Sequence, residues 1–390
     1  MLKTQRLFDI DAKMRNFDAT VMSCEPSGDG RYLVTLDRTA FFPEEGGQSC
    51  DGGTLGGAKV LFVSEKDDVI THTTDTVLEV GSCVSGSIDF DVRFRKMQNH
   101  TGEHIISGLI YKHYGYHNVG FHLGGEITAD FDGELSADDI RKIEDLANEV
   151  VVACRDVRAY YPNESELRNM EYRSKLELSD GVRIVDIDGV DKCACCAPHV
   201  SNTGEVGQIR ILDSIRYKGG SRIYMRCGFD ALDDYRSRLE QIQHVSMAIS
   251  AKQSEIGDGV DRLVEELGRK KGQISALRRE IMGYKLASLE HSERSVCIFD
   301  FCDDALALRN FVNDAVKKTD RICAVFSGSD GDGYKYIIVS EKIKLRALSS
   351  LINERLCGCG GGSDAMIQGS CSATEEEIRS FFDDDSWIDG

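Results

Sequence analysis

The spacing of apolar and polar residues along the chain changes several times, and the first part is strand-like. Residues 1–92 contain short alternating runs such as "RYLVTLD", "AKVLFV" and "GSCVSGSID", separated by glycine-rich turns. Alternation with a period of two, interrupted by glycine, is typical of short strands buried on one face. This part therefore predicts a small β-barrel-like subdomain.

Residues 93–230 mix helical and strand patterns. The segment "HTGEHIISGLIYKHYG" has helical spacing that ends at Gly115, and a second helix fits "SADDIRKIEDLANEVVVACRD" with Ser136 as its N-cap. The run "VRIVDID" alternates as a strand, and "GQIRILDSIRYKGGSRIYMRC" predicts a hairpin that turns at Gly219 and Gly220. The first 230 residues are expected to form an α+β unit in two parts.

The pattern changes again after residue 230. Residues 231–292 carry two heptad seams of apolar residues separated by "GDG" at positions 257–259, which predicts an antiparallel helical hairpin. Residues 293–390 alternate strand-like runs ("SVCIFDF", "RICAVFSG", "YKYIIVS") with helical stretches, as a small α/β domain does. The glycine-rich "CGCGGGSDAMIQG" falls late in that domain.

Composition narrows the class of protein. A formal charge of -19 disfavours unspecific binding of nucleic acid, so any RNA contact needs a local basic patch. The fourteen cysteines are scattered and the first residues lack the apolar core of a signal peptide, which favours a reducing, cytoplasmic location. No apolar run approaches the roughly 20 residues of a membrane-spanning helix.

Two short segments could together bind a metal ion. "HTGEH" places His100 and His104 at positions i and i+4, so both side chains share one helix face. "CCAPH" places Cys195 and His199 four residues apart after a strand, in a turn near Pro198. Three histidines and one cysteine suit the tetrahedral nitrogen and sulfur coordination of zinc, with one ion per chain.

Other interpretations of the same residues exist. His100 and His104 alone fit a pair of hydrogen-bonded core histidines as well as they fit a metal site, because a buried histidine is usually only hydrogen-bonded. Cys193 and Cys196 form a C-x-x-C, the spacing of a redox pair, although the expected strand-to-helix context is missing. "HTGEH" also fits the H-x-x-E-H of inverted zinc proteases, with Glu103 as general base, but that class leaves "CCAPH" without a role.

Three separated segments resemble the freestanding alanyl-tRNA editing proteins, which are similar to the editing domain of alanyl-tRNA synthetase. They are "TAFFPEEGGQSCDGGTL", "QNHTGEHIISGLI" and "CACCAPHVSNTGEVGQIRI", in the order and spacing of the family. The helical hairpin and "CGCGGGSDAMIQG" resemble the synthetase's linker helices and C-terminal domain, so the resemblance extends to the long form of the family. Ala197 and Pro198 replace the family's usual glycine-threonine step.

The resemblance implies an α+β fold with a β-barrel-like subdomain (1–92), a zinc-binding editing subdomain (93–230), a helical hairpin linker (231–292) and a C-terminal α/β domain (293–390). It implies zinc-dependent hydrolysis of seryl- or glycyl-tRNA(Ala). Because the chain begins at the β subdomain, with no room for an aminoacylation core, we expect no charging of tRNA.

The family pattern also indicates further site residues. Thr39 and Gln48 are carried over as uncharged groups that hydrogen-bond the substrate or the attacking water, although Thr39 could instead cap a turn and Gln48 could fix its loop. Gly46 and Gly47 fit a backbone that passes close to the terminal adenosine. Glu103 is a candidate general base, or a support for the ligands.

Partners follow from the remaining charges and from the family. The predicted hairpin carries Arg216, Lys218 and Arg222, a candidate contact for tRNA, and a second basic run lies at residues 269–279. A homodimer through the C-terminal part is a further expectation. Two alternatives remain open: a zinc-containing tRNA-binding module without turnover, and editing of seryl-tRNA(Thr).

Overall fold

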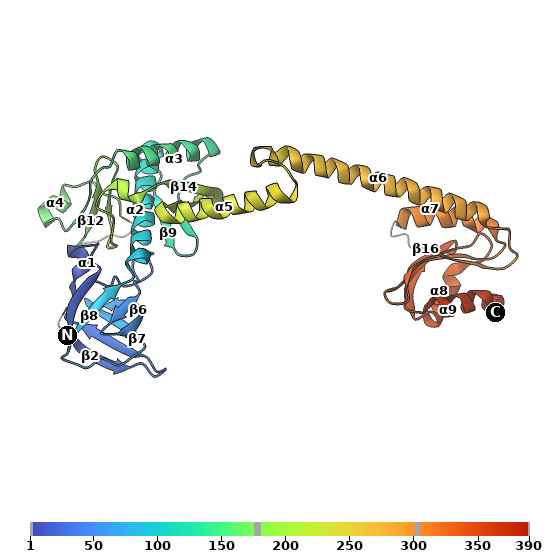
Figure 1. Ribbon diagram of the computed structural model, residues 1–390, viewed down its shortest axis with the longest axis horizontal. Helices are drawn as coiled ribbons and strands as arrows, with labels where there is room; N and C mark the ends of the chain where they lie inside the picture. The colour runs from blue at the N-terminus through green and yellow to red at the C-terminus, as the bar shows by residue number, and fades with distance from the viewer. Residues whose placement is uncertain (1–2, 175–180, 301–304, 389–390) are drawn as a thin grey trace. The chain divides into compact units, whose positions relative to one another are not determined.

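The computed structural model describes residues 3–174, 181–300 and 305–388. These residues form two compact units that divide between His244 and Val245. Both units mix helices with sheets, which confirms the α+β class (Figure 1). None of the helices in the described ranges has a stretch both long and apolar enough to span a bilayer.

The first part of the chain forms a sheet that closes on itself. Its six strands pair in the order β2-β3-β7-β6-β5-β8, and β8 pairs back onto β2. The strands are β2 (Asn16–Pro26), β3 (Tyr32–Leu36), β5 (Gly53–Leu55), β6 (Ala58–Lys66), β7 (Val69–Thr74) and β8 (Cys83–Ile88). Alternate residues of each strand point into a core that includes Val34, Leu36 and Phe41, as the period of two predicts.

Three short elements lie beside this closed sheet. The strands β1 (Gln5–Arg6) and β4 (Arg38–Thr39) pair in parallel, and helix α1 (Leu7–Ile10) follows β1. Leu7 and Phe8 of α1 pack into the same apolar core. Residues 5–10 are thereby fixed to the segment around Thr39.

The predicted helix at "HTGEH" is confirmed, but it begins ten residues earlier. Helix α2 (Phe90–Tyr114) starts after the N-cap Asp89 and ends at Gly115, whose φ is 72°. Residues 97–110 are buried without interruption. A helix buried all around has no one-sided apolar pattern, so the polar run before His100 carried no periodic signal.

Two sheets surround α2. The first has the order β14-β15-β10-β9, and the second the order β11-β12-β13, which packs β13 against α2. The strands are β9 (Asn118–Leu123), β10 (Ile127–Phe131), β11 (Val157–Tyr160), β12 (Ile184–Ile187), β13 (Asp191–Ala194), β14 (Ile209–Tyr217) and β15 (Gly220–Cys227). Strand β12 confirms the prediction from "VRIVDID".

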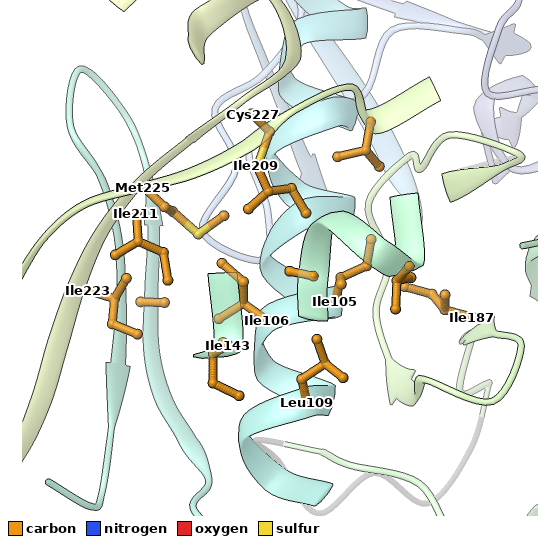
Figure 2. Close-up of a cluster of buried hydrophobic side chains, with 14 of the residues drawn as sticks. Ile105, Ile106, Leu109, Ile143, Ile187, Ile209, Ile211, Ile223, Met225 and Cys227 are labelled. Atoms are coloured by element: carbon orange, nitrogen blue, oxygen red, sulfur yellow. The ribbon is translucent and has the colours of Figure 1, made fainter. Parts of the chain in front are cut away.

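Helix α3 (Ala137–Val152) covers the first of these sheets and also packs on α2. Its N-cap is Ser136, as predicted, and Asp139 completes a capping box. Ile143 of α3 meets Ile106 and Leu109 of α2 in a core shared with β14 and β15 (Figure 2). A short helix α4 (Glu164–Arg168) follows β11, and a 3-10 helix (Thr203–Val206) precedes β14.

The predicted β14–β15 hairpin is also confirmed. Tyr217 pairs with Gly220, so the two-residue turn is Lys218–Gly219, one residue before the predicted position. Both turn residues have positive φ angles, 47° and 84°, which is the conformation that tight hairpin turns require.

Two long helices occupy the predicted linker: α5 (Gly228–Ala248) and α6 (Ile256–Ser288). The prediction that "GDG" separates them is wrong, since Gly257 and Gly259 lie in the first turn of α6. The break falls instead at residues 249–255. A Cβ atom at Gly259 would lie 2.7 Å from Ile249, so the glycine permits close packing of that connection. The antiparallel pairing of α5 with α6 stays a prediction.

The C-terminal unit has a five-stranded sheet of order β16-β17-β18-β20-β19. Only the first pair is parallel. The elements after α6 are β16 (Val296–Asp300), α7 (Ala305–Ala315), β17 (Cys323–Ser329), β18 (Gly333–Val339), α8 (Leu345–Arg355), β19 (Gly358–Gly362), β20 (Met366–Cys371) and α9 (Glu375–Asp383). The three predicted strand runs are β16, β17 and β18, and the glycine-rich segment forms the hairpin β19–β20.

Candidate metal centre

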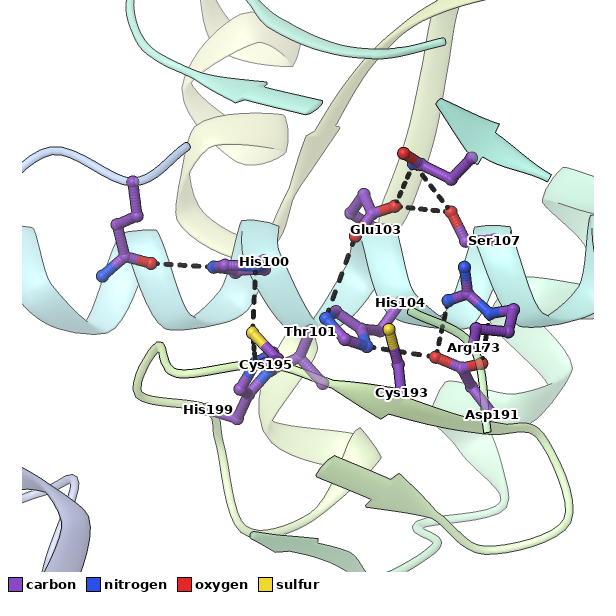
Figure 3. Close-up of polar contacts among 12 residues, drawn as sticks. His100, Thr101, Glu103, His104, Ser107, Arg173, Asp191, Cys193, Cys195 and His199 are labelled. Atoms are coloured by element: carbon purple, nitrogen blue, oxygen red, sulfur yellow. Dashed lines mark hydrogen bonds and ion pairs between the residues drawn. The ribbon is translucent and has the colours of Figure 1, made fainter. Parts of the chain in front are cut away.

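Helix α2 presents His100 and His104 on one face, one turn apart (Figure 3). Two glycines of α2 allow its neighbours to approach closely. A Cβ atom at Gly102 would lie 2.3 Å from Sγ of Cys227, and one at Gly108 would lie 2.6 Å from the carbonyl oxygen of Val190. The histidines are therefore held on a rigid element in close contact with both sheets.

The segment after β13 supplies the other two candidate ligands, Cys195 and His199. Arg183 fixes this segment, because its Nη1 donates to the carbonyl oxygens of Cys195 at 3.1 Å and Ala197 at 2.8 Å. The backbone N–H of Cys195 donates in turn to the carbonyl oxygen of Arg183. As predicted around Pro198, the segment has no helix, and it turns both side chains toward α2.

The four side chains converge on one point. One ligand atom from each of His100, His104, Cys195 and His199 lies within 4.8 Å of every other. The Sγ of Cys195 is 3.3 Å from Nε2 of His199 and 3.6 Å from Nε2 of His100. All three histidines are buried. This donor set and its convergence fit a metal ion.

Each histidine also has a hydrogen-bond partner at its second nitrogen. Nδ1 of His100 lies 2.9 Å from Oε1 of Gln48, and Nδ1 of His104 lies 3.0 Å from a carboxylate oxygen of Asp191. Nδ1 of His199 lies 3.0 Å from the hydroxyl of Thr101. Partners at Nδ1 leave Nε2 available, and metal-binding histidines are usually oriented in this way.

The carboxylate that orients His104 is itself held in place. Arg173 donates Nε and Nη2 to the two oxygens of Asp191, each at 2.7 Å. Burial alone would raise the pKa of Asp191, but the hydrogen bonds from His104 and Arg173 outweigh it and hold that pKa below its usual value. Asp191 therefore stays ionised as a buried acceptor.

The cluster also favours a thiolate. Burial by itself raises the pKa of Cys195, but the charges and hydrogen bonds of the surrounding histidines, led by His100, hold it well below the ordinary value. Burial lowers the pKa of His199 to about 3, against the opposing effect of Cys195. The thiolate of Cys195 and the neutral imidazole of His199 are the protonation states in which these two residues can bind a metal.

A cavity of about 390 Å3 opens beside the cluster. His100, His104 and Cys195 line it, and so do Arg6 and Tyr161. Further lining residues are Glu45, Gly46, Glu103, Phe121, Arg173, Ser174, Gly181, Val182, Arg183, Cys193, Ala194 and Cys196. The ring of Phe121 lies 4.8 Å from that of His100, between centroids. The cavity is therefore a small-molecule-sized site with the candidate metal ligands in its wall.

The structure brings Gln48 and the two glycines next to this cluster. Gln48 is completely buried, and its Nε2 has no hydrogen-bond partner among the described residues. Gly47 accepts a hydrogen bond from the N–H of Leu123, and a Cβ atom on it would lie 2.8 Å from the carbonyl oxygen of Phe121. The loop is therefore packed directly on β9, and only Gly46 of the two lines the cavity.

Thr39 lies elsewhere. Its hydroxyl is 2.9 Å from Nε2 of His72 and also accepts the N–H of Phe41, and the residue is completely buried in β4, beside the closed sheet. Thr39 is not among the residues that line the cavity. These two hydrogen bonds match the alternative in which the threonine caps a turn.

Glu103 lies in the cavity wall, but one of its oxygens is already occupied. Oε1 accepts hydrogen bonds from the hydroxyl of Ser107 and, at 2.5 Å, from Nδ2 of Asn118. Oε2 lies 4.0 Å from Nε2 of His104. Glu103 is thus adjacent to the cluster, as predicted, and is available through Oε2 only.

The other two cysteines of the segment do not form a disulfide. Cys193 lies close to His104 and Asp191, and Sγ of Cys196 would lie 3.2 Å from a Cβ atom at Gly46. Burial raises the pKa of both thiols, which disfavours a reactive redox pair. The protease interpretation is also disfavoured, because Cys195 and His199 occupy the positions next to the two histidines of α2.

The basic hairpin is less positive than its sequence indicates. Arg216 pairs with Glu134, and Arg222 forms two hydrogen bonds with Asp130, at 2.6 and 2.7 Å, while its guanidinium lies over the ring of Tyr217. These acids come from segments far away in the sequence, so the hairpin alone could not reveal them. Lys218 lies in the turn, near the Tyr217 ring.

Thr101, Asp191 and Arg173 were not among the site residues expected from the sequence. Thr101 lies within "HTGEH" itself, and Asp191 precedes Cys195 by four residues, so both had a local signal. Arg173 had no such local signal. It meets Asp191 only because the backbone of its segment pairs with that of Cys193.

Fold and cluster together define this chain as an α+β protein with a candidate metal centre beside a cavity. Residues 182–225 match the family model described as the threonyl and alanyl tRNA synthetase second additional domain. This match includes Cys195, His199 and most of the β14–β15 hairpin.

Whole-chain relatives are alanine-tRNA ligases. That of Ignicoccus hospitalis is 30% identical over 96% of this chain, and that of Pyrococcus abyssi is 29% identical over 97%. The chain spans 42% and 43% of the lengths of these two relatives. The resemblance to the alanyl-tRNA synthetase editing proteins is therefore confirmed: the chain is related to alanyl-tRNA synthetase over nearly its whole length.

Proposed function

We propose that the chain is a zinc-dependent hydrolase that deacylates seryl- or glycyl-tRNA(Ala), without charging tRNA itself. The observation that carries the proposal is the wall of the cavity, where His100, His104 and Cys195 meet. The relationship to alanine-tRNA ligases supplies the substrate class. The size of the cavity, about 390 Å3, suits an aminoacyl group with part of its ribose.

The residues around the cluster have an orienting role. Gln48, Thr101 and Asp191 each hold one imidazole through Nδ1, so the Nε2 atoms and Sγ of Cys195 are fixed in place. Zinc bound there would supply a positive charge that orients the amine or a ribose oxygen of the substrate. Because the chain offers four ligands, we favour this orienting role over the activation of water, which needs an open position.

Hydrolysis also needs a water molecule held near the ester carbonyl and a group that accepts its proton. Glu103 is the candidate in the cavity wall, acting through Oε2, since Oε1 is committed to Ser107 and Asn118. Gly46 lets the chain pass close to the substrate, because its φ of 61° suits a residue without a side chain. Thr39 would act only through the turn it caps.

The test is deacylation of seryl-tRNA(Ala) by the purified chain and by the His104→Ala, Cys195→Ala double variant, with zinc content measured on both. We expect multiple turnovers by the wild-type chain, and loss of both zinc and turnover in the double variant. A matched control is Cys193→Ala, which removes a neighbouring thiol and should retain zinc. Zinc without turnover on any substrate would contradict the hydrolase and leave a tRNA-binding module.

A second substrate has a specific observation in its favour. The matching family model covers threonyl as well as alanyl tRNA synthetases, so seryl-tRNA(Thr) belongs in the same assay. Faster turnover of seryl-tRNA(Thr) than of seryl-tRNA(Ala) would replace the proposed substrate. The chemistry of the site would be unchanged.

Contact with tRNA through Arg216, Lys218 and Arg222 is part of the proposal, and it requires the two arginines to exchange their carboxylate partners for phosphates. Reversing the charges of Arg216 and Arg222 should weaken tRNA binding. It should also make the dependence of the binding constant on salt concentration shallower, by the equivalent of about two phosphate contacts. Binding measured at several salt concentrations is the readout. Arg168→Glu, on the exposed helix α4, is the matched control, and equal effects of both changes would exclude the hairpin.

A further inference from the structure

The turn that ends at Gln48 places one more carboxylate, that of Glu45, in the wall of the cavity. The backbones of Glu45 and Gln48 exchange two hydrogen bonds, at 3.1 and 3.0 Å. Between them, Gly46 and Gly47 have φ angles of 61° and 81°, the conformation of a tight hairpin turn. The side chain of Gln48 contacts Nδ1 of His100 at 2.9 Å. Glu45 therefore belongs to a rigid turn whose other end contacts a candidate metal ligand.

The carboxylate of Glu45 is exposed and has no positive neighbour. Cys196 lines the same part of the cavity. Burial raises the pKa of the Cys196 thiol, and the charges of Cys195 and Glu45 add to that rise, so the carboxylate lies close to a neutral sulfur atom. Over the described ranges of the chain, Glu45 takes part in no ion pair.

The positive charges in the cavity wall are already balanced. Each of the three arginines of the wall is paired with a carboxylate that does not line the cavity: Arg6 with Glu65, Arg173 with Asp191 and Arg183 with Asp9. The charge of Glu45 is thus left without an opposite charge among the described residues of the wall. A charge of this kind in a cavity attracts a ligand group of the opposite sign.

We propose that Glu45 binds the α-ammonium group of the aminoacyl ester, so that the cavity selects esters whose amine is free. The proposal rests on the proposed function, because it takes an aminoacyl-tRNA as the ligand. A carboxylate and an ammonium group form a charge-assisted hydrogen bond, which is stronger than a bond between neutral groups. An ester whose nitrogen is acylated carries no such charge and is selected against.

The charge of the metal centre supports this orientation of the substrate. With zinc bound, one thiolate and three neutral imidazoles would leave a net positive charge at the cluster. That charge repels an ammonium group and attracts an oxygen lone pair. The amine is therefore assigned to Glu45, and a ribose oxygen is left for the cluster.

The competing role for Glu45 is a hydrogen bond from a neutral ribose hydroxyl, which a carboxylate also accepts. The two roles differ in how binding depends on the charge of the ligand. An ammonium site loses affinity when a hydroxyl replaces the amine. A ribose site is indifferent to that replacement.

The first experiment measures binding without turnover. The probes are two amides of 3′-amino-3′-deoxyadenosine, one with serine and one with glyceric acid, in which a hydroxyl replaces the amine. At about pH 6.5, below the ordinary pKa of an α-amino group, calorimetry should show about ten-fold tighter binding of the serine amide. Glu45→Gln should abolish this preference. Glu44→Gln removes the preceding exposed carboxylate, which does not line the cavity, and should retain it.

Three results of this titration would overturn the proposal. They are a preference for the serine amide that survives Glu45→Gln, an equal loss of affinity for both amides in that variant, and no binding of either amide to the wild-type chain. The second of these results would assign Glu45 to the ribose.

The second experiment compares deacylation of seryl-tRNA(Ala) with that of tRNA(Ala) acylated with glyceric acid. Glu45→Gln should lower kcat/KM for the seryl ester about ten-fold and leave that for the glyceryl ester within about two-fold. The change in preference is the readout, because the intrinsic reactivity of each ester is the same for both proteins. Turnover whose preference is unchanged by Glu45→Gln would leave the hydrolase standing and exclude the ammonium site. Binding preference without turnover would do the reverse.

Discussion

Helices α2 and α6 contrast in how they distribute polar and apolar side chains. Helix α2, with 25 residues, buries His100, Glu103 and His104 among apolar neighbours, whereas α6, with 33 residues, exposes Leu267 and Leu277 to solvent. A buried polar group is costly unless it has a partner, and an exposed apolar row is unusual on a monomer. The polar groups of α2 are satisfied by hydrogen bonds within the candidate metal centre, whereas nothing in the described part of its unit covers the apolar row of α6.

The polar groups of the first unit extend beyond α2, and one of them should make this unit sensitive to acid. His72 is completely buried, its Nε2 accepts the hydroxyl of Thr39, and burial lowers its pKa to about 4. In the unfolded chain the His72 imidazole binds a proton below about pH 6.5, but in the folded chain it does so only below about pH 4. Stability should therefore fall by about 3 kcal/mol as the pH decreases from about 6.5 to about 4.

The measurement is denaturant unfolding at several pH values, followed by hydrogen exchange in β3 and β7. The only tryptophan, Trp387, lies in the other unit, so its fluorescence is an internal control that this group should not affect. His72→Gln should remove this part of the pH dependence, whatever its effect on stability at neutral pH. The same pH dependence in wild type and variant would show that His72 is not responsible.

The close packing of α2 predicts the next largest effect. A methyl group at Gly108 would meet the backbone of Val190 at 2.6 Å and the side chain of Asp191 at 2.7 Å. Gly108→Ala should therefore destabilise the first unit by about 1–3 kcal/mol. It should also weaken zinc binding by shifting β13, which carries Asp191. Thermal unfolding and zinc titration measure the two effects, and a variant as stable as wild type would mean that α2 can move away from β13.

Asp191 tests how far the cluster depends on its hydrogen-bonded supports. Asp191→Asn keeps the shape but removes the charge that orients His104 and balances Arg173. We expect zinc affinity about 10–100-fold lower, measured by competition with a chelator. Asp186→Asn is the control, since Asp186 lies one strand away and pairs with Lys192 near the surface. An equal loss in both variants would indicate a general effect of charge.

The smallest effect is expected in α6 and has the opposite sign. Nothing lies within 4 Å of a Cβ atom at Gly272, in the middle of α6. Gly272→Ala should therefore stabilise α6 by about 0.5–1 kcal/mol, because alanine loses less conformational freedom in a helix. Thermal unfolding followed by circular dichroism measures this gain. A loss of stability would show that this face of α6 is covered by a partner and not by solvent.

Local patterns determined most of the secondary structure and pointed to the candidate metal ligands. The i,i+4 histidines, the N-cap Ser136 and the hairpin before residue 227 needed only neighbouring residues, and the structure contains all three. The extent of α2 was missed because a helix buried on every side loses its period. The position of the break between α5 and α6 was missed because Gly259 serves close packing there rather than a turn.

The sequence by itself determined which candidate metal-ligating residue types are present, and at what spacing within each segment. Only the tertiary structure decided that the two segments, some ninety residues apart, meet at one point. It also decided that Asp191 orients His104, that Thr39 is committed to His72, and that Asp130 and Glu134 neutralise the hairpin. Each of these is a pairing between distant segments, and such pairings depend on how the chain buries its apolar surface as a whole.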